Sequence, residues 1–170
     1  MSSSPQLAPL RVMFFCLGNI CRSPLAEAVF RHQVAARGLT DRFIIESSGT
    51  SDYHVGEPPD PGSQRVARER LGLELSGQRA QQLQPAHLRQ CDVLVAMSAS
   101  NVKNARRLDG GREAHLVLLR DWEPSPALQG LDVPDPWGYG SDAFSEVFEI
   151  VERCCQQLLD DLIADPPRPF

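Results

Sequence analysis

The sequence predicts an α/β fold: a single doubly wound domain with a four-stranded parallel sheet and helices on both faces. Short, continuously apolar runs alternate along the chain with segments of helical periodicity, as in parallel sheets that helices cover on both sides. The length of 170 residues suits one domain with a sizeable core. We therefore expect one domain over residues 1–170, with an ordered core over about 11–163 and frayed ends.

The first elements follow from apolar patterns and their stop signals. A strand is expected at 11–16, where an apolar run ends at Cys16. A helix is expected over 24–37, because apolar residues recur near one helical face and Gly38 follows its end. The apolar residues 43–46 predict a second strand.

The middle of the chain is rich in turn signals. Residues 47–51 are expected to end the second strand in a turn, and a loop with several prolines and glycines follows at 56–62. A helix is expected over 63–71, where Gly72 stops it, and a weaker helical stretch over 85–90.

The second half of the chain continues the alternation. Strands at 92–97 and 114–119 flank a helix from about 100 to 108, and the last helix is expected over 142–163. The proline-rich segment 120–140 is expected to lack regular structure, and a loop of that length is usually functional in a compact domain. Right-handed crossovers would give a doubly wound sheet, whose ligands bind beyond the carboxyl ends of the strands.

The composition excludes several classes of function. A net charge of −5 argues against general binding to nucleic acid or to anionic membranes. No run approaches the ~18 apolar residues that span a membrane, and the N-terminus lacks the apolar core of a signal peptide. Cysteines without a short disulfide spacing fit a reducing cytoplasm, where we expect the protein. No metal-ligand spacing is present, and the scattered histidines are expected at the surface or in packing roles: His32, His54, His87 and His115.

The most informative motif runs over 16–24 and reads Cys-Leu-Gly-Asn-Ile-Cys-Arg-Ser-Pro. It places the thiol of Cys16 at the end of a strand, before a loop whose backbone N–H groups lead into a helix N-terminus. Such a loop binds a tetrahedral anion and stabilises a thiolate, the reactive form of cysteine. Gly18 lets the backbone approach a ligand, Arg22 can donate two hydrogen bonds to phosphate-like oxygens, and Ser23 offers an N-cap. The cysteine-to-arginine spacing alone is weak evidence, but this context indicates phosphoryl transfer through cysteine.

A second group of chemistry-bearing residues lies in the proline-rich segment. Prolines on both sides of Asp135 restrict the backbone, which suits a carboxyl that is held in one place. A phenolate leaving group has a conjugate-acid pKa of ~10, so a positioned acid should accelerate its departure by roughly 10²–10⁴-fold. Trp137 and Tyr139 are expected to line a slot for an aryl substrate, while Asp121 and Asp132 are weaker acid candidates.

These motifs resemble those of the low-molecular-weight protein tyrosine phosphatases, and the resemblance extends from about Val12 to Leu159. Several separated segments match the family in the right order, which is more specific than any single match: 15–27, 46–50, 53–60, 91–101 and 133–137. The resemblance implies hydrolysis of protein phosphotyrosine, an aryl phosphate monoester, in two steps through a phosphocysteine. It implies no metal or organic cofactor and a phosphotyrosine-containing protein or peptide as partner; we expect a monomer or weak dimer.

The resemblance also implies roles for individual residues. Cys16 matches the nucleophile, Arg22 the arginine that binds phosphoryl oxygens, and Asp135 the general acid and later base. Asn19 and Ser47 match a hydrogen-bonded pair that holds the loop. The other matches complete the phosphate-binding loop and the cleft walls: Leu17, Gly18, Ile20, Cys21 and Ser23 in the loop, with Ser23 also stabilising the thiolate, and Leu17, Ile20, Tyr53 and Trp137 along the cleft.

Two loop positions bear on specificity and regulation. Relatives that hydrolyse phosphoarginine resemble this loop but carry threonine where this chain has Ile20, so phosphotyrosine is expected and phosphoarginine is the alternative. Gly138 replaces a second aromatic residue of many members, which would alter substrate preference. Cys21 shares the loop with Cys16, and in some members such a pair forms a reversible disulfide under peroxide; packing behind the loop is the alternative.

Two further classes of function stand as alternatives. An arsenate reductase of the related fold relays oxidation through two further cysteines, but residues 97–105 contain none. A phosphate-binding module or phosphoryl carrier without catalysis would not need Asp135 in a rigid loop. Leu71 and Ser98 also depart from the family pattern, at positions outside the chemistry.

Overall fold

The computed structural model describes residues 7–164, whose strands form one parallel sheet in the order β2-β1-β3-β4. The strands are β1 (Leu10–Cys16), β2 (Phe43–Gly49), β3 (Val93–Ala96) and β4 (Leu116–Leu118). The helices are α1 (Arg22–Ala36), α2 (Pro61–Leu71), α3 (Pro85–Gln90), α4 (Ala99–Ala105) and α5 (Ser141–Ile163), with a short 3₁₀ turn η1 (Thr40–Arg42) before β2. This architecture confirms the predicted α/β fold. The fraying expected at 1–6 and 165–170 lies outside the described residues.

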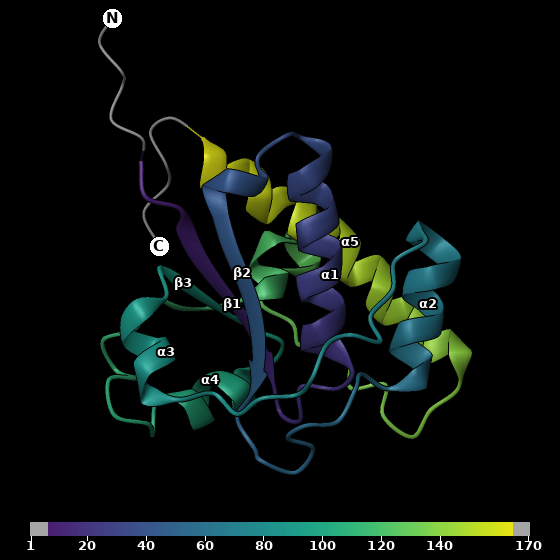
Figure 1. The fold of residues 1–170 in the computed structure, drawn as a ribbon, viewed down its shortest axis with the longest axis horizontal. Helices are drawn as coiled ribbons and strands as arrows, with labels where there is room; N and C mark the ends of the chain where they lie inside the picture. The colour runs from purple at the N-terminus through teal and green to yellow at the C-terminus, as the bar shows by residue number, and fades with distance from the viewer. Residues whose placement is uncertain (1–6, 165–170) are drawn as a thin grey trace, which may run out of the picture.

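Helices cover both faces of the sheet, as Figure 1 shows. On one face α1 and α5, with α2 beside them, bury a core that includes Phe14 and Val95. On the other face α3 and α4 lie over a second core around Phe15 and Leu94. Because alternate side chains of a strand enter opposite cores, β1 and β3 are apolar at consecutive positions.

The second strand is longer than its apolar pattern predicts. The turn expected at 47–51 is wrong for its first residues, because Ser47, Ser48 and Gly49 pair with the last residues of β1. Both serines are buried, and the hydroxyl of Ser48 lies 3.3 Å from the sulfur of Met13. A buried strand can include serine where hydrogen bonds satisfy the hydroxyl, and an apolar pattern does not reveal this.

The first helix begins at Arg22 rather than at Pro24, and Cys21 rather than Ser23 is its N-cap, so the predicted cap is wrong. Ser23 lies inside the first turn, where its hydroxyl is 3.0 Å from the sulfur of Cys16. Pro24 is tolerated because the first N–H groups of a helix have no partner within the helix.

Three other boundaries differ from the sequence pattern. α2 begins at Pro61, before its predicted start, because the carboxylate of Asp60 caps it by accepting a hydrogen bond from Gly62 N at 2.8 Å. α4 ends at Ala105, earlier than predicted. β4 is confined to the residues that pair with β3, since a strand is defined by its partner.

The proline-rich segment 120–140 is more ordered than expected. It includes most of the 3₁₀ turn η2 (Leu119–Trp122) and all of a second one, η3 (Pro126–Leu128). Leu119 is buried, and the indole N–H of Trp122 donates to Asp161 of α5 at 2.8 Å. The start of this segment is therefore fixed against the longest helix.

The topology places a crevice at the end of β1. The chain leaves β1 toward β2 on one side and returns to β3 on the other, so the carboxyl end of β1 lies where the strand order reverses. Across the residues that the structure describes, no helix is long and apolar enough to cross a membrane.

Candidate active site

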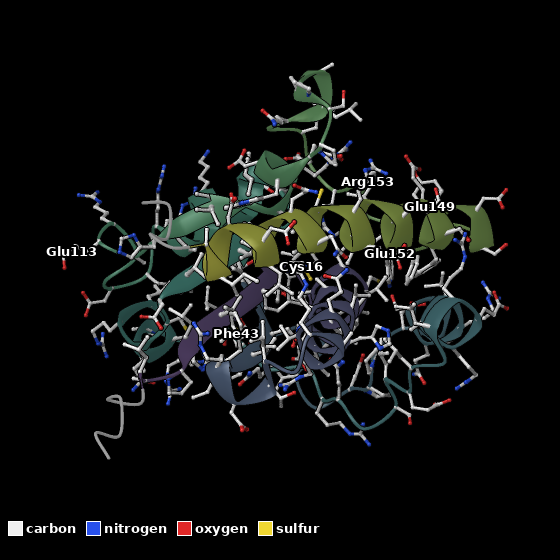
Figure 2. The ribbon with its side chains drawn as sticks, turned by 90° about the horizontal axis from the view of Figure 1, so that it is seen from above. Cys16, Phe43, Glu113, Glu149, Glu152 and Arg153 are labelled. Atoms are coloured by element: carbon white, nitrogen blue, oxygen red, sulfur yellow. The ribbon has the colours of Figure 1, made fainter. Side chains whose placement is uncertain are left out.

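Cys16 is the last residue of β1, and residues 16–22, the phosphate-binding loop, connect it to α1. In Figure 2 Cys16 lies near the centre of the molecule, at the inner end of the purple strand. A cavity of about 180 Å³ opens here. Every residue of the loop except Asn19 lines it, together with Tyr53, His54, Asp135 and Trp137.

The sulfur of Cys16 is buried among donors. The backbone N–H of Asn19 points to Sγ at 3.3 Å, and the hydroxyl of Ser23 lies 3.0 Å from it. The side-chain amide of Asn19 donates to Ser23 Oγ at 2.8 Å, so the hydroxyl hydrogen is free to turn either to the sulfur or to Ser48 O at 3.2 Å. Donors directed at Sγ stabilise its thiolate form.

Asn19 has an unusual backbone conformation and fixes the loop with its side chain. Its φ is +56°, and it is the only non-glycine residue with positive φ in the described part of the chain. The side-chain amide donates to Ser47 Oγ at 3.0 Å as well as to Ser23, and its oxygen accepts from Gln81 N at 3.0 Å. Gln81 also donates to Ser47 O at 2.9 Å. Asparagine tolerates this conformation better than most residues, and its partners on three other segments hold it there.

The carbonyl oxygens of the loop are occupied from outside the cavity. Leu17 O accepts from Ser51, Ile20 O from the amide of Asp60 at 2.7 Å, and Cys21 O from the hydroxyl of Ser63 at 2.8 Å. With the carbonyls turned outward, the loop N–H groups remain available to an anion in the cavity.

Gly49 at the end of β2 allows the loop to lie close to the sheet. A Cβ at this position would be 2.6 Å from Leu17 O and 3.0 Å from Asn19 N, closer than side-chain carbons approach other atoms. Only glycine fits without moving the loop.

Arg22 links the loop to the second half of the chain. Its buried guanidinium donates from Nη1 to Val133 O at 3.1 Å, and Nη2 lies 3.7 Å from Asp135 Oδ2. Its Nε is buried without a hydrogen-bond partner among the described residues, so the guanidinium retains a donor for an oxygen of a ligand.

Residues 132–137, the acid loop, carry Asp135 over the cavity. Its carboxylate accepts from Trp137 N at 3.1 Å, and its side chain is 50% exposed. The stem of the loop is fixed: Val133 is buried and donates to Met97 O at 2.8 Å, while Asp132 accepts from Ala99 N at 2.8 Å.

The weaker acid candidates lie outside the cavity lining. Asp132 contacts the N-terminus of α4, and Asp121 accepts from the amide of Leu118 at 3.4 Å. Neither carboxyl lines the cavity, whereas that of Asp135 does.

The aromatic candidates divide between cavity and surface. Tyr53 and Trp137 line the cavity and are largely exposed, as walls at an entrance would be. Tyr139 is 73% exposed and does not line it. His54 does line it, which the sequence analysis missed; its Nδ1 lies 2.7 Å from Glu57 Oε2. The sequence signal that could have identified His54 as a cavity residue was its position directly after Tyr53.

Cys21 lines the same cavity as Cys16. Burial raises the pKa of the Cys21 thiol far above its ordinary value, and the nearby carboxylates of Asp60 and Asp135 raise it further. Cys21 is therefore a neutral thiol at physiological pH. The other cysteines, which are also free and buried, lie outside this cavity: Cys91, Cys154 and Cys155.

The site residues offer an anion cradle rather than a metal site. Over residues 7–164 no group of three or more His, Cys, Asp or Glu side chains is arranged to hold a metal ion. A thiol, a guanidinium and a carboxyl around one small cavity can bind a tetrahedral anion, attack it and exchange a proton with its leaving group.

Comparison with known proteins gives matches over nearly the whole chain. Residues 11–167 match the sequence model of the family described as low molecular weight phosphotyrosine protein phosphatase. The low molecular weight protein-tyrosine-phosphatase YfkJ of Bacillus subtilis is 38% identical over 88% of this chain and 94% of its own. A low molecular weight protein-tyrosine-phosphatase of Streptomyces coelicolor is 42% identical over 88% of this chain and 91% of its own.

Solved structures agree with the sequence matches. The crystal structure of YfkJ from Bacillus subtilis superposes with a TM-score of 0.84 at 35% identity and covers 92% of this chain and 96% of that one. A protein tyrosine phosphatase from Entamoeba histolytica, with Hepes in the active site, gives a TM-score of 0.81 at 28% identity, with 90% and 96% covered.

Proposed function

The chain belongs to the low molecular weight phosphotyrosine protein phosphatase family, and on this premise we propose that it hydrolyses protein phosphotyrosine through a phosphocysteine intermediate. One observation carries the proposal: the thiol of Cys16, the guanidinium of Arg22 and the carboxyl of Asp135 line a single cavity of about 180 Å³. It is large enough for a phosphoryl group and open to an aromatic ring at its entrance.

In the first step the thiolate of Cys16 attacks phosphorus, so that an S–P bond forms as the bond from phosphorus to the phenolic oxygen breaks. Asp135 transfers its proton to that oxygen, and the product leaves as neutral tyrosine. The N–H groups of the loop and the free Nε–H of Arg22 hold the remaining phosphoryl oxygens, where negative charge is concentrated in the transition state.

In the second step a water molecule attacks the phosphocysteine. The carboxylate of Asp135 accepts the proton of that water as the O–P bond forms and the S–P bond breaks. Inorganic phosphate departs and the Cys16 thiolate is restored, with the amide of Asn19 and the hydroxyl of Ser23 as its hydrogen-bond donors.

The cavity walls favour an aryl phosphate. Tyr53 and Trp137 provide apolar surfaces for a phenyl ring, and Ile20 offers no hydroxyl to orient the guanidinium of phosphoarginine. Arsenate reduction by a cysteine relay is not favoured, since Cys16 and Cys21 are the cysteines that line the cavity among the described residues.

The experiment that tests the proposal compares peptides that contain phosphotyrosine, phosphoserine or phosphoarginine. We expect the wild type to cleave phosphotyrosine, Cys16→Ser to have no measurable activity, and Asp135→Ala to lose about 10²–10⁴-fold in kcat/KM. Asp121→Ala is the matched control, because this carboxyl lies in the same segment but outside the cavity lining, and it should retain activity. Wild-type activity in Cys16→Ser would contradict the mechanism, and faster turnover of phosphoarginine would contradict the substrate class.

We also propose that Cys21 protects the nucleophile. Peroxide converts the Cys16 thiolate to a sulfenic acid, and the Cys21 thiol then displaces water from it to form a disulfide that thiols can reduce. One feature supports this: both cysteines line the same cavity.

A further inference from the structure

Glu123 follows η2 and has a fully buried carboxylate, with a side-chain exposure of 0%. Arg120 Nε donates to its Oε1 at 2.8 Å. Arg153 of α5, labelled in Figure 2, donates from Nε to Oε2 at 2.8 Å and from Nη2 to Oε1 at 2.9 Å. Both carboxylate oxygens are therefore paired with guanidinium groups from two different elements.

The charged form of this group is maintained in the fold. Burial by itself would raise the pKa of Glu123, but the hydrogen bonds from Arg153 and Arg120 outweigh burial and hold the pKa below its ordinary value. Burying an ionic cluster is a poor way to stabilise a protein, because apolar residues of similar volume often serve as well or better. A role in positioning another part of the molecule therefore explains this buried group better than a contribution to stability alone.

The second contact of Arg120 leads toward the cavity. Its Nη1 donates to the carbonyl of Asp132 at 2.9 Å, at the stem of the acid loop. The next carbonyl, that of Val133, accepts from Arg22 Nη1 at 3.1 Å. A continuous set of hydrogen bonds thus runs from α5 through the buried carboxylate and Arg120 to Asp132, three residues before Asp135.

We propose that Arg120, Glu123 and Arg153, here called the buried ionic cluster, fix the position of the Asp135 carboxyl and so control proton delivery to the leaving group. The inference rests on the proposed function, in which Asp135 is the general acid. The three residues are positioning residues, since none of them lines the cavity. The competing explanation is that the cluster only stabilises the fold.

The leaving group distinguishes the two explanations. Phenyl phosphate expels a phenolate whose conjugate-acid pKa is ~10, so it depends on the acid, whereas dinitrophenyl phosphate expels a much weaker base. The value of kcat/KM covers the steps up to departure of the leaving group, so slow hydrolysis of the phosphocysteine cannot hide the effect. A misplaced acid should slow the phenyl ester selectively, while a partly unfolded enzyme loses activity equally on both.

The experiment measures kcat/KM on both esters for the wild type, Arg120→Met, Arg153→Met and Asp135→Asn. For Arg120→Met we expect kcat/KM to fall about tenfold on phenyl phosphate and less than about threefold on the dinitrophenyl ester. Asp135→Asn should show the same selectivity with a larger loss on phenyl phosphate. Competitive inhibition by inorganic phosphate should be unchanged within about twofold, because the phosphate-binding loop keeps its own braces.

Arg153→Met is the second variant, since this arginine is partly exposed and its loss leaves Arg120 bonded to Glu123. We expect the same selectivity with a smaller loss, and this result decides the matter if Arg120→Met does not fold. Arg70→Met is the matched control: Arg70 also pairs with a glutamate of α5, Glu149 at 3.2 Å, but it does not touch the acid loop. Arg70→Met should leave the ratio of kcat/KM between the two esters unchanged.

The outcomes separate this inference from the proposed function. Equal losses on both esters, or no loss, in a folded cluster variant would overturn the positioning role while Asp135→Asn still shows selective loss. If Asp135→Asn itself shows no selectivity, the assignment of the acid in the proposed function is wrong, and the positioning role is wrong with it.

Discussion

The phosphate-binding loop and the acid loop meet at one cavity, and they are held in different ways. In the phosphate-binding loop the side chains of Cys16, Asn19 and Arg22 are buried, and hydrogen bonds from several elements fix the carbonyls and the Asn19 side chain. In the acid loop the hydrogen bonds to other segments are made by the stem, at Asp132 and Val133. At its functional end the side chains of Asp135 and Trp137 are half or more exposed, although Pro136 between them is buried.

This difference follows from what each loop is proposed to do. Dipoles that stabilise an anion are effective only when they are already oriented, so the loop that binds phosphate must be rigid before substrate arrives. A group that first donates a proton and then accepts one from water must be reachable by solvent. The comparison indicates that precise placement of the Asp135 carboxyl depends on the stem of the acid loop, since the carboxyl itself is half exposed.

Among changes to the residues that hold the two loops, the largest effect should come from Gly49→Ala, which breaks the rigid phosphate-binding loop. The added methyl would lie 2.6 Å from Leu17 O and must displace the loop. Misplacement on the scale of 1 Å can cost about 10²-fold, so we expect a loss of that order in kcat/KM on aryl phosphates with good and poor leaving groups alike. Gly77→Ala is the control, because a Cβ there meets no atom within 4 Å. Near-normal activity in Gly49→Ala would show that the loop is not rigid.

A second prediction concerns Cys21, the residue of the rigid loop whose pKa Asp135 helps to raise. Cys21→Ala should keep its phosphatase activity within about threefold, since the proposed chemistry does not use this thiol. After peroxide treatment the wild type should recover its activity on addition of thiols, but Cys21→Ala should not. Without Cys21 the sulfenic acid of Cys16 has no thiol partner in the cavity and proceeds to irreversible forms.

Cys91→Ala is the matched control for that measurement. Burial raises the pKa of Cys91 to about 11, yet this residue lies outside the cavity, so the variant should recover as the wild type does. Equal recovery of Cys21→Ala and the wild type would argue that Cys21 only packs behind the loop.

The smallest expected effect is a change in how stability depends on pH, caused by Glu123→Gln in the cluster that holds the acid loop. The pKa of Glu123 is lower in the folded protein than its ordinary value, so its contribution to stability is complete above that ordinary value and declines as pH falls through the folded one. Urea unfolding should therefore show the difference between wild type and variant narrowing from pH 6 to pH ~3.5. Glu69→Gln, which alters an exposed carboxylate on α2, should show no such narrowing; a constant difference for Glu123→Gln would mean that its charge is not coupled to folding.

Much of the site could be predicted because its chemistry is local in the sequence. Cys16 and Arg22 lie in one motif between an apolar run and a helix, and Asp135 lies between two prolines. The parallel sheet was likewise visible in strands that are apolar at consecutive positions. The ends of the strands and helices were harder to predict. Ser47 and Ser48 looked like turn residues, yet they are buried in β2 because hydrogen bonds satisfy their hydroxyls.

Other parts of the site carried no local signal. Gln81 braces Asn19 from a segment far along the chain, and His54 lines the cavity although histidines looked scattered. Tyr139, only two residues beyond Trp137, does not line the cavity, since residue spacing does not say which way a loop turns.

The sequence by itself determined the fold class and the residues with reactive groups, because periodicity and motif spacing are properties of neighbouring residues. Only the tertiary structure decided what holds those groups: the glycine that lets the loop approach the sheet, the asparagine fixed from three segments, and the buried ionic cluster behind the acid loop. These arrangements depend on contacts between residues that are distant in the chain. Such contacts are set by packing and hydrogen bonding in three dimensions, on which local patterns have no bearing.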